Sequence, residues 1–246
     1  MSAWLFDLGN SRLKYASRGE DGAIGAMAAI DHRDTGFAAL PQAVRGETAW
    51  LAAVGPSALQ AGLLDILSER FARVSLARTS AICGALRIAY AAPQRLGVDR
   101  FLALLAACAQ REAILLVGVG TALTVDLLDA HGRHRGGRIA PSPTLMRECL
   151  QARAARLPAR GGSYRAFADD TVDALASGCE GAALALVEQS RNLASQALGT
   201  TPRLWLHGGG AAGLLPRLAD AALHPGLVLQ GLARYAALGD AGPARA

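Results

Sequence analysis

Short apolar runs alternate with helical patterns along the chain, and this succession occurs twice. In the first half the pattern predicts strands at 4–8, 13–17, 49–54, 74–76 and 86–89, a further strand within 23–30, and helices near 37–44, over 57–70 and from 99 to 108, the last capped by Asp99. In the second half it predicts strands at 114–119, 124–128, 134–139 and 204–206, helices over 144–157 and 171–198, and two C-terminal helices. This alternation of strands and helices indicates an α/β protein.

The two halves of the chain begin alike. Residues 4–11 (WLFDLGNS) and 115–122 (LLVGVGTA) each consist of an apolar strand, a glycine and a polar residue before another strand. This likeness indicates an internal duplication, and we place the boundary near Arg111, with domains of residues 1–111 and 112–246. Two similar α/β halves that face each other leave a cleft between them, which is a preferred place for a ligand.

Composition narrows the class of protein. The chain has 246 residues, of which 52% are hydrophobic and 18% charged, and this balance excludes a disordered chain. The longest uncharged run without proline, 113–125, is too short for a membrane span, which needs roughly 20 apolar residues. No secretory signal is visible, and the four cysteines are far apart without a CxxC pair. We therefore expect a cytoplasmic protein with no membrane partner.

The positive charge comes almost entirely from arginine. Lys14 is the only lysine among 25 basic residues, and the net charge is +5. The stretch 133–165 is locally basic, since only Glu148 opposes its eight arginines. A solvated arginine-rich face is favoured over an anion-binding one, and no aromatic residues interleave as a single-strand platform requires. We therefore do not expect a nucleic-acid partner.

The strongest local motif is 7–14 (DLGNSRLK). A tight hairpin with glycine at its tip exposes backbone N–H groups that can hold phosphate oxygens, and Asn10 and Ser11 add side-chain donors. Asp7 at the strand end can hold a metal ion or its waters, while Lys14 would supply positive charge to the phosphates. An ordinary turn in a hairpin explains the same pattern, so the motif alone leaves both interpretations open.

Two glycine-rich runs lie in the second half. The run 118–126 (GVGTALTVD) repeats the hairpin logic, with Thr121 as a phosphate-facing hydroxyl. The run 208–213 has the literal GxGxxG form of a dinucleotide site, which makes a nicotinamide or flavin enzyme a rival interpretation. That rival is weak, because the strand-like segment 227–229 ends at Gln230, where a ribose-binding acid is required.

The run 90–100 (YAAPQRLGVDR) places an acid and an arginine side by side. Asp99 can accept the proton of a hydroxyl, and Arg100 can pair with a carboxylate, so together they suit a phosphoryl acceptor that carries both groups. Read alone, the pair is better explained as a helix start with a surface ion pair. His131 and His134 have a spacing that metal sites use, but a solvated turn is the better interpretation.

Taken in order, these motifs resemble the type III pantothenate kinases of the acetate/sugar kinase, Hsp70 and actin superfamily. The resemblance rests on DLGNSRLK at 7–14, YAAPQRLGVDR at 90–100, GTALTVD at 120–126, GGRIAP at 136–141, RLP at 156–158, TVDALASG at 171–178, GGGA at 208–211 and LVLQGL at 227–232. It implies two ribonuclease-H-like (actin-like ATPase) domains with a nucleotide cleft between them.

The resemblance also implies a reaction and its residues. The enzyme would transfer the ATP γ-phosphate to the 4′-hydroxyl of pantothenate, the first step of coenzyme A biosynthesis, with Asp99 as general base and Mg²⁺ held by Asp7. The nucleotide-binding residues would be Asp7, Leu8, Gly9, Asn10, Ser11, Arg12, Leu13, Lys14, Gly120 and Thr121. Pantothenate would be bound by Tyr90, Gly97, Val98, Asp99, Arg100 and Thr171. Thr171 would come from the second subunit of a homodimer.

The chain departs from the family pattern in three places. The family has an aspartate at the position of Gly118, where it helps to hold a monovalent cation (K⁺ or NH₄⁺), so dependence on this cation is doubtful here. The usual Thr-Gly-Gly-Asp is replaced by residues 207–210, with His207 first and Gly210 last, and Pro141-Ser142-Pro143 replaces Pro-Gly. The alternative is therefore a catalytically impaired family member with a regulatory, DNA-associated role.

Overall fold

A computed structural model describes residues 3–33 and 36–240 of the chain. The chain forms two compact units. Unit 1 comprises the described residues within Met1–Arg111, His131–His134 and Gly226–Ala246, and unit 2 comprises Glu112–Ala130 and Arg135–Pro225. No helix in the described ranges is long and apolar enough to cross a membrane.

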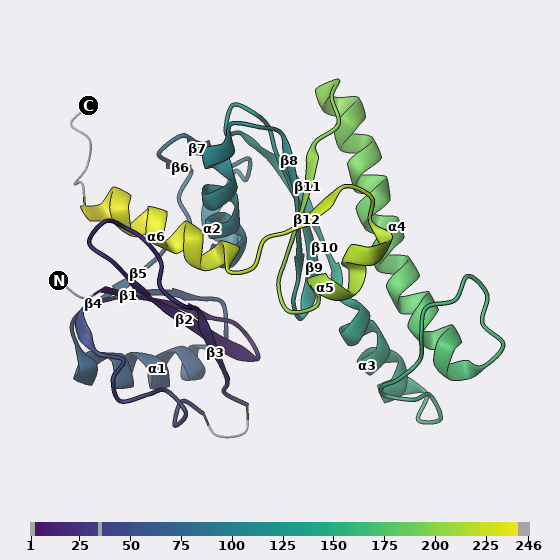
Figure 1. Cartoon of the computed structure of the whole chain (residues 1–246), viewed down its shortest axis with the longest axis horizontal. Coiled ribbons are helices and arrows are strands. Elements are labelled where there is room, and N and C mark those ends of the chain that lie inside the picture. Colours follow the sequence, from purple (N-terminus) through teal and green to yellow (C-terminus); the bar gives the residue numbers. More distant parts are fainter. Residues whose placement is uncertain (1–2, 34–35, 241–246) are drawn as a thin grey trace. The chain divides into compact units, whose positions relative to one another are not determined.

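Unit 1 is built on a five-stranded sheet with helices on both faces (Figure 1). Its strands are β1 (Ala3–Leu8), β2 (Arg12–Arg18), β3 (Ala28–Asp31), β4 (Gly46–Ala53) and β5 (Phe71–Leu76), in the order β3-β2-β1-β4-β5. Leu63 and Leu67 of α1 (Ser57–Arg70) belong to the core of one face, together with Leu51. Trp50 points the opposite way along β4 and contacts Tyr235 of α6 (Leu227–Asp240), which covers the second face with α2 (Val98–Ala107).

Unit 2 has a second five-stranded sheet with the same strand order. Its strands are β8 (Ile114–Val119), β9 (Ala122–Leu128), β10 (His134–Pro141), β11 (Arg203–His207) and β12 (Ala221–Leu223), in the order β10-β9-β8-β11-β12. The helices are α3 (Pro143–Arg153), α4 (Thr171–Leu198) and the short α5 (Ala211–Leu214). Ala183, Leu184 and Val187 of α4 pack on the apolar face of the sheet. The identical strand order of the two sheets agrees with the internal duplication that the sequence indicates.

The remaining elements are small, and several sequence predictions need correction. A two-stranded sheet of β6 (Ile82–Cys83) and β7 (Leu86–Arg87) completes the assigned strands, and short 3₁₀ helices span Pro93–Arg95, Cys108–Gln110 and Leu215–Arg217. Residues 37–44 form turns and not a helix, because Pro41 interrupts the helical ladder. Asp99 is not the N-cap of α2; Gly97 takes that position and Asp99 lies in the first turn.

The compact units and the predicted domains share the break after Arg111 but differ at the C-terminus. Helix α6 packs against α2 and contacts β1, β2 and β4, all within unit 1. The helices approach closely at Gly231, where a β-carbon would collide with the backbone carbonyl of Leu102. A lack of side chain at this crossing therefore lets the last helix of the chain pack with the first unit. All four cysteines are free thiols, and Cys149 is exposed.

Candidate active site

The hairpin of β1 and β2 presents the predicted phosphate loop. The N–H of Gly9 donates to the carbonyl of Arg12 at 3.0 Å and closes the turn. Leu8 and Leu13 are fully buried in the core, so they can offer only backbone groups to a nucleotide. Asn10 and Arg12 are exposed at the tip, with Ser11 half-buried between them. The turn therefore exposes polar groups, while Leu8 and Leu13 anchor the strands on either side of it in the apolar core.

Asp7 and Lys14 face each other across this hairpin. They are register partners, and Nζ of Lys14 lies 3.4 Å from Oδ2 of Asp7. Asp7 is 5% exposed, whereas the Lys14 side chain is 38% exposed. Burial raises the pKa of Asp7, Lys14 opposes that rise, and the charge of Asp99 adds to it. Asp7 and Asp99 therefore lie within electrostatic reach of each other in unit 1.

The start of α2 holds Asp99 in a defined place. A β-carbon at position 97 would lie 2.6 Å from Oδ1 of Asp99, so the carboxylate folds back over Gly97. Val98 beside it is buried, so its contribution to a ligand site would come from the backbone. Because an acid in the first turn is favoured by the helix dipole, this carboxylate is stabilised at the helix N-terminus.

Arg100 and Tyr90 form a second polar group next to Asp99. Arg100 is 6% exposed, and its guanidinium donates to the hydroxyl oxygen of Tyr90 at 3.3 Å. The Tyr90 ring stacks on the His134 ring with their centroids 5.8 Å apart. His134 is thus buried, and the expectation of a solvated turn is wrong for this residue. Within the described ranges no three His, Cys, Asp or Glu residues form a metal cluster.

The hairpin of β8 and β9 also has a glycine after its first strand, but its turn is one residue shorter than that of the first hairpin. The N–H of Gly120 donates to the carbonyl of Ala122 at 2.9 Å, and Thr121 is exposed at the tip. Ser142 braces this tip, since its N–H donates to the carbonyl of Thr121 at 3.4 Å. Ser142 also caps α3, with Oγ accepting from the Leu145 N–H at 3.3 Å. The Pro-Ser-Pro departure thus supplies a helix cap next to the second hairpin.

The GxGxxG run forms a turn on the second hairpin and not a dinucleotide site. Gly208 has φ +94° and lies against the backbone of Val119, where any side chain would collide. The N–H of Gly210 donates to the Val119 carbonyl at 3.0 Å. The following helix α5 has four residues, and 227–229 begins helix α6 instead of forming a strand. The rival interpretation as a nicotinamide or flavin enzyme is therefore wrong.

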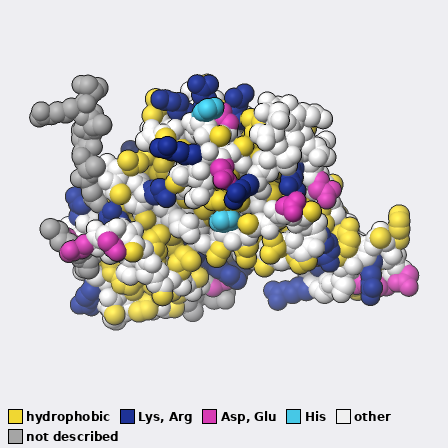
Figure 2. All heavy atoms as spheres, turned by 45° about the horizontal axis from the view of Figure 1, so that its top comes forward, with side chains coloured by type: hydrophobic (Ala, Val, Ile, Leu, Met, Phe, Trp, Pro, Cys, Tyr) yellow, Lys and Arg dark blue, Asp and Glu magenta, His cyan; other side chains and the backbone are white. Residues whose placement is uncertain are grey.

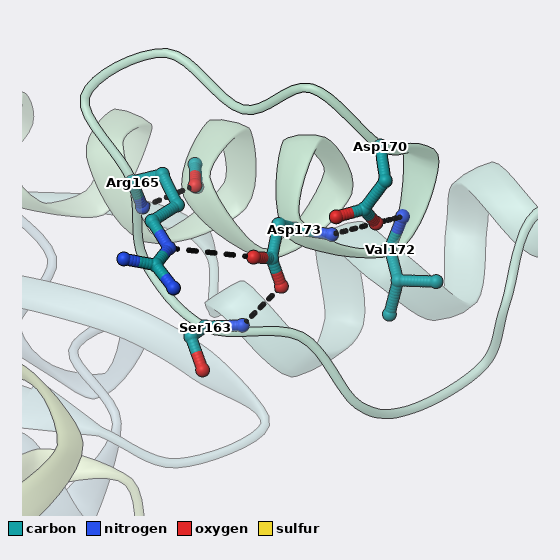
Figure 3. Close-up of polar contacts among 6 residues, drawn as sticks. Ser163, Arg165, Asp170, Val172 and Asp173 are labelled. Carbon is teal, nitrogen blue, oxygen red and sulfur yellow. Dashed lines mark hydrogen bonds and ion pairs between the residues drawn. The ribbon is translucent and has the colours of Figure 1, made fainter.

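Thr171 is exposed as the first residue of α4, in unit 2, whereas the other predicted pantothenate residues belong to unit 1. Figure 3 shows how this helix start is held. The Asp170 carboxylate caps the helix by accepting from the N–H groups of Val172 at 2.8 Å and residue 173 at 3.0 Å. Asp173 accepts from the Ser163 N–H at 2.7 Å, and Nε of Arg165 lies 3.5 Å from its other oxygen.

Several arginines of the basic stretch are engaged within unit 2. Arg135 pairs with Asp129 at 3.4 Å, and Arg147 donates to the carbonyl of Gly161 at 2.7 Å. Arg138 donates to the side-chain oxygen of Gln189 at 2.9 Å. On the face shown in Figure 2, basic side chains lie in separate groups with acidic or uncharged atoms between them. These contacts favour the solvated interpretation of the stretch over an anion-binding surface.

Sequence reasoning missed two residues that brace the hairpins. His32 is 5% exposed, and its Nε2–H donates to the carbonyl of Gly9 at 2.9 Å. Its counterpart is Ser142, which braces Thr121 in the second hairpin. No local pattern marks His32, because it follows a short strand far from the loop that it contacts. Ser142 carried a usable signal, since serine followed by proline is typical of a helix start.

The fold and the two hairpins define the class of actin-like ATPases and sugar kinases. A Campylobacter jejuni protein assigned to the Baf family of transcriptional activators matches with a TM-score of 0.64 at 19% identity, covering 97% of this chain and 99% of its own. A Sinorhizobium meliloti protein assigned as a 2-dehydro-3-deoxygalactonokinase matches at 0.55 and 16%, covering 98% and 100%. The activator of 2-hydroxyisocaproyl-CoA dehydratase from Clostridium difficile matches at 0.53 and 11%, covering 98% and 97%. These identities establish the fold alone.

Sequence comparison establishes the family. The family model of type III pantothenate kinases matches residues 4–192. The type III pantothenate kinase of Stenotrophomonas maltophilia (strain R551-3) is 55% identical over 244 residues, 98% of this chain and 100% of the relative. That of Xylella fastidiosa (strain M23) is 53% identical over 240 residues, 97% of this chain and 98% of the relative. The chain therefore belongs to the type III pantothenate kinase family, and it is a kinase of the actin-like fold.

Proposed function

We propose that this kinase transfers the γ-phosphate of ATP to the 4′-hydroxyl of pantothenate, with Asp99 as general base. The observation that carries the proposal is the grouping of Asp7, Lys14 and Asp99 within unit 1, where the charge of Asp7 interacts with those of both Lys14 and Asp99. Family membership supplies the reaction class and the substrates. The side chains of unit 1 supply the two functions that this reaction needs, which are neutralisation of phosphate charge and removal of a proton.

The first hairpin would hold the phosphates of ATP. Backbone N–H groups and the side chains of Asn10, Ser11 and Arg12 supply donors, and Lys14 supplies positive charge. A buried carboxylate beside a phosphate loop fits magnesium, which is bound by one or two carboxylates together with phosphates and waters. Asp7 fits that description, because 5% exposure and a strand-end position place it next to the hairpin tip. Magnesium, when bound, would neutralise charge on the phosphates.

Asp99 would accept the hydroxyl proton as the pantothenate oxygen attacks the γ-phosphorus. The new oxygen–phosphorus bond forms as the bond to the β-phosphate oxygen breaks, ADP leaves, and the proton moves to Asp99. Arg100 would pair with the carboxylate of pantothenate, and its hydrogen bond to Tyr90 holds the guanidinium in place. The backbone around Gly97 and Val98 would complete this half of the acceptor site.

Unit 2 would contribute the second hairpin and Thr171. The exposed hydroxyl of Thr121 and the N–H groups near Gly120 suit the phosphates, as the position of this tight glycine turn at the end of β8 supports. Thr171 is exposed at the start of α4. The hydrogen bond from the Ser163 N–H to the Asp173 carboxylate holds the loop beside this helix start. We propose that Thr171 reaches the pantothenate site of a second subunit in a homodimer. The free cysteines support a reducing, cytoplasmic location.

The regulatory, DNA-associated alternative is not favoured. Such a role would need a basic surface available to phosphates, whereas several arginines of 133–165 are engaged with Asp129, Gly161 and Gln189. A family member that had lost kinase activity would also have no need to keep both Asp99 and Lys14. Salt-dependent DNA binding without ADP formation would reverse this preference.

The test is ADP release by the purified protein with ATP, Mg²⁺ and pantothenate. Asp99→Asn removes the base and keeps the shape of the side chain, so kcat should fall by about 10²- to 10⁴-fold. Gly97→Ala should also lower kcat, because the new methyl group would displace the Asp99 carboxylate from its place over residue 97.

Asp65→Asn is the matched control, since Asp65 is an exposed aspartate within α1 of the same unit. It should leave kcat and Tm at the wild-type values. Pantothenate-dependent ADP release that Asp99→Asn leaves intact would exclude Asp99 as the base. Absence of pantothenate-dependent release from the wild type would overturn the proposed function.

A further inference from the structure

The two hairpins place different residues at matching positions. In unit 1 the central strand position Asp7 is flanked in register by Lys14 on β2 and Ala52 on β4. In unit 2 the corresponding position is Gly118, flanked by Thr124 on β9 and by His207 on β11. Unit 2 thus has no carboxylate at the position that matches Asp7, and a histidine lies where unit 1 has the small residue Ala52.

His207 fills the space that a side chain at position 118 would need. A β-carbon there would lie 2.6 Å from Oγ1 of Thr124, 3.0 Å from Nε2 of His207 and 3.1 Å from its Cε1. Real β-carbons avoid such contacts, so a hydroxyl and an imidazole converge on the point above the glycine. A side chain at residue 118 would therefore displace both the Thr124 hydroxyl and the His207 ring from their present positions.

This geometry does not fit the monovalent cation that the family uses. Hard cations take oxygen ligands, above all carboxylates and carbonyls, and Gly118 offers no side-chain oxygen. An imidazole lies where the carboxylate would project. The ring also stands directly before the Gly208 turn that packs on Val119, so it lies beside the second phosphate hairpin. The chain has therefore replaced an ion-holding group by a side chain of its own.

We infer that His207 takes the place of the monovalent cation next to the second hairpin, so that ATP binding does not depend on potassium. The inference rests on the proposed function, because it concerns the same nucleotide site. It explains Gly118 and His207 together as one compensated exchange instead of two separate losses. It also predicts that restoring the aspartate alone is ineffective, because the imidazole still occupies the space.

The test measures the Kd of ATP with Mg²⁺ by calorimetry, without pantothenate, so that the readout is independent of turnover. Each protein is titrated in potassium chloride and in tetramethylammonium chloride at about 0.1 M, which keeps ionic screening equal. The proteins are the wild type, Gly118→Asp, His207→Thr and the double variant Gly118→Asp/His207→Thr, with Tm measured for each. Threonine is the residue that the family pattern has at position 207.

The wild-type Kd should be the same in both salts. In the double variant potassium should tighten ATP binding by about fivefold or more, the lower end of usual couplings between two bound ligands. Neither single variant should respond, because Gly118→Asp keeps the obstruction and His207→Thr lacks the carboxylate.

Potassium-dependent ATP binding by the wild type would overturn the inference, and this arm needs no variant to fold. A response of Gly118→Asp alone equal to that of the double variant would overturn it as well. Absence of ATP binding by the wild type in either salt would instead overturn the proposed function.

Discussion

The hairpins β1–β2 and β8–β9 share an antiparallel pairing with a glycine at the end of the first strand, and they differ in loop length and in charge. Each closes its turn with a hydrogen bond from a glycine N–H, at 3.0 Å in the first and 2.9 Å in the second. The first carries Asp7 and Lys14 at facing positions, whereas the second carries Gly118 and Thr124 there. Duplication has therefore kept the strand pairing and the glycine, while the facing acid and lysine occur at these positions in unit 1 only.

The hairpins are also braced in different ways. In the first, the side chain of His32 donates to the Gly9 carbonyl at 2.9 Å, and its backbone N–H lies 3.5 Å from the Ser11 carbonyl oxygen that accepts from it. In the second, the backbone N–H of Ser142 donates to the Thr121 carbonyl at 3.4 Å. A side-chain brace can be removed by one substitution, whereas a backbone brace survives nearly all of them. The comparison teaches that two duplicated hairpins can differ in how strongly a single mutation affects them.

The largest expected effect is on kcat, and it tests whether Lys14 of the first hairpin contributes more to the reaction than Thr124 at the matching position of the second. Lys14→Met should lower kcat by about 10²- to 10³-fold, the loss typical of removing one group that stabilises developing charge. Thr124→Val, at the matching position, should change kcat by no more than about tenfold, because a neutral hydrogen bond contributes only about 0.5–1.5 kcal/mol. Steady-state ADP release with saturating ATP and pantothenate measures both. Equal losses for the two variants would contradict the division of charge between the units.

An effect of intermediate size, on stability and on the KM for ATP, distinguishes the His32 side-chain brace from the Ser142 backbone brace. His32→Leu leaves the Gly9 carbonyl without its donor, so the free energy of unfolding should fall by about 1–3 kcal/mol, and the KM for ATP should rise. Ser142→Ala removes the cap of α3 at a similar cost of about 1 kcal/mol, but its N–H remains. The KM for ATP should therefore stay at the wild-type value.

Urea unfolding and initial rates at varied ATP concentration measure both quantities. Destabilisation by the two variants with a rise in KM for His32→Leu only is the expected pattern. A rise in KM for Ser142→Ala would show that the second hairpin depends on the helix cap and not on the backbone brace.

The smallest expected effect is the pH dependence of stability, and it arises from His224, which follows the edge strand β12 of unit 2. The His224 N–H donates to the Leu206 carbonyl at 2.7 Å, as the Ala77 N–H does to the Leu51 carbonyl at 2.8 Å in unit 1. Only unit 2 has a histidine here, and its ring stacks on Trp205 with centroids 3.6 Å apart. Burial lowers the pKa of His224, and its Nε2 finds no partner among the described residues.

The pKa of His224 in the folded protein lies below the unfolded value of about 6.5. Protonation of this group therefore leaves the free energy of unfolding unchanged above that pH and lowers it as the pH falls through the window below. His224→Ala introduces the residue that unit 1 has at this place. Between about pH 7.5 and pH 5.5, which bracket the ordinary histidine pKa, the wild type should lose more Tm than the variant. Thermal unfolding in a pH series checks this, and parallel curves would remove His224 as the acid-sensitive group.

Local patterns were enough for much of the fold. The bounds predicted for α1 at 57–70, for α4 at 171–198 and for β8 at 114–119 are those of the structure. These elements have long periodic patterns or fully apolar runs, and their ends carry ordinary start and stop residues. The segment 37–44 failed because its apolar spacing was helical while Pro41 forbade the helix. The functional roles of the site residues stay predictions from the family resemblance.

The sequence by itself indicated the internal duplication, the two glycine hairpins and the presence of an acid, a lysine and an arginine in motifs of a known family, whereas the strand order came from the structure. Tertiary structure alone decided that His32 braces Gly9, that His134 is buried under Tyr90 and that α6 packs in unit 1. It alone showed that His207 occupies the space above Gly118. Local periodicity reports which face of an element is buried, whereas these contacts join residues far apart in the chain, and only packing chooses the partners.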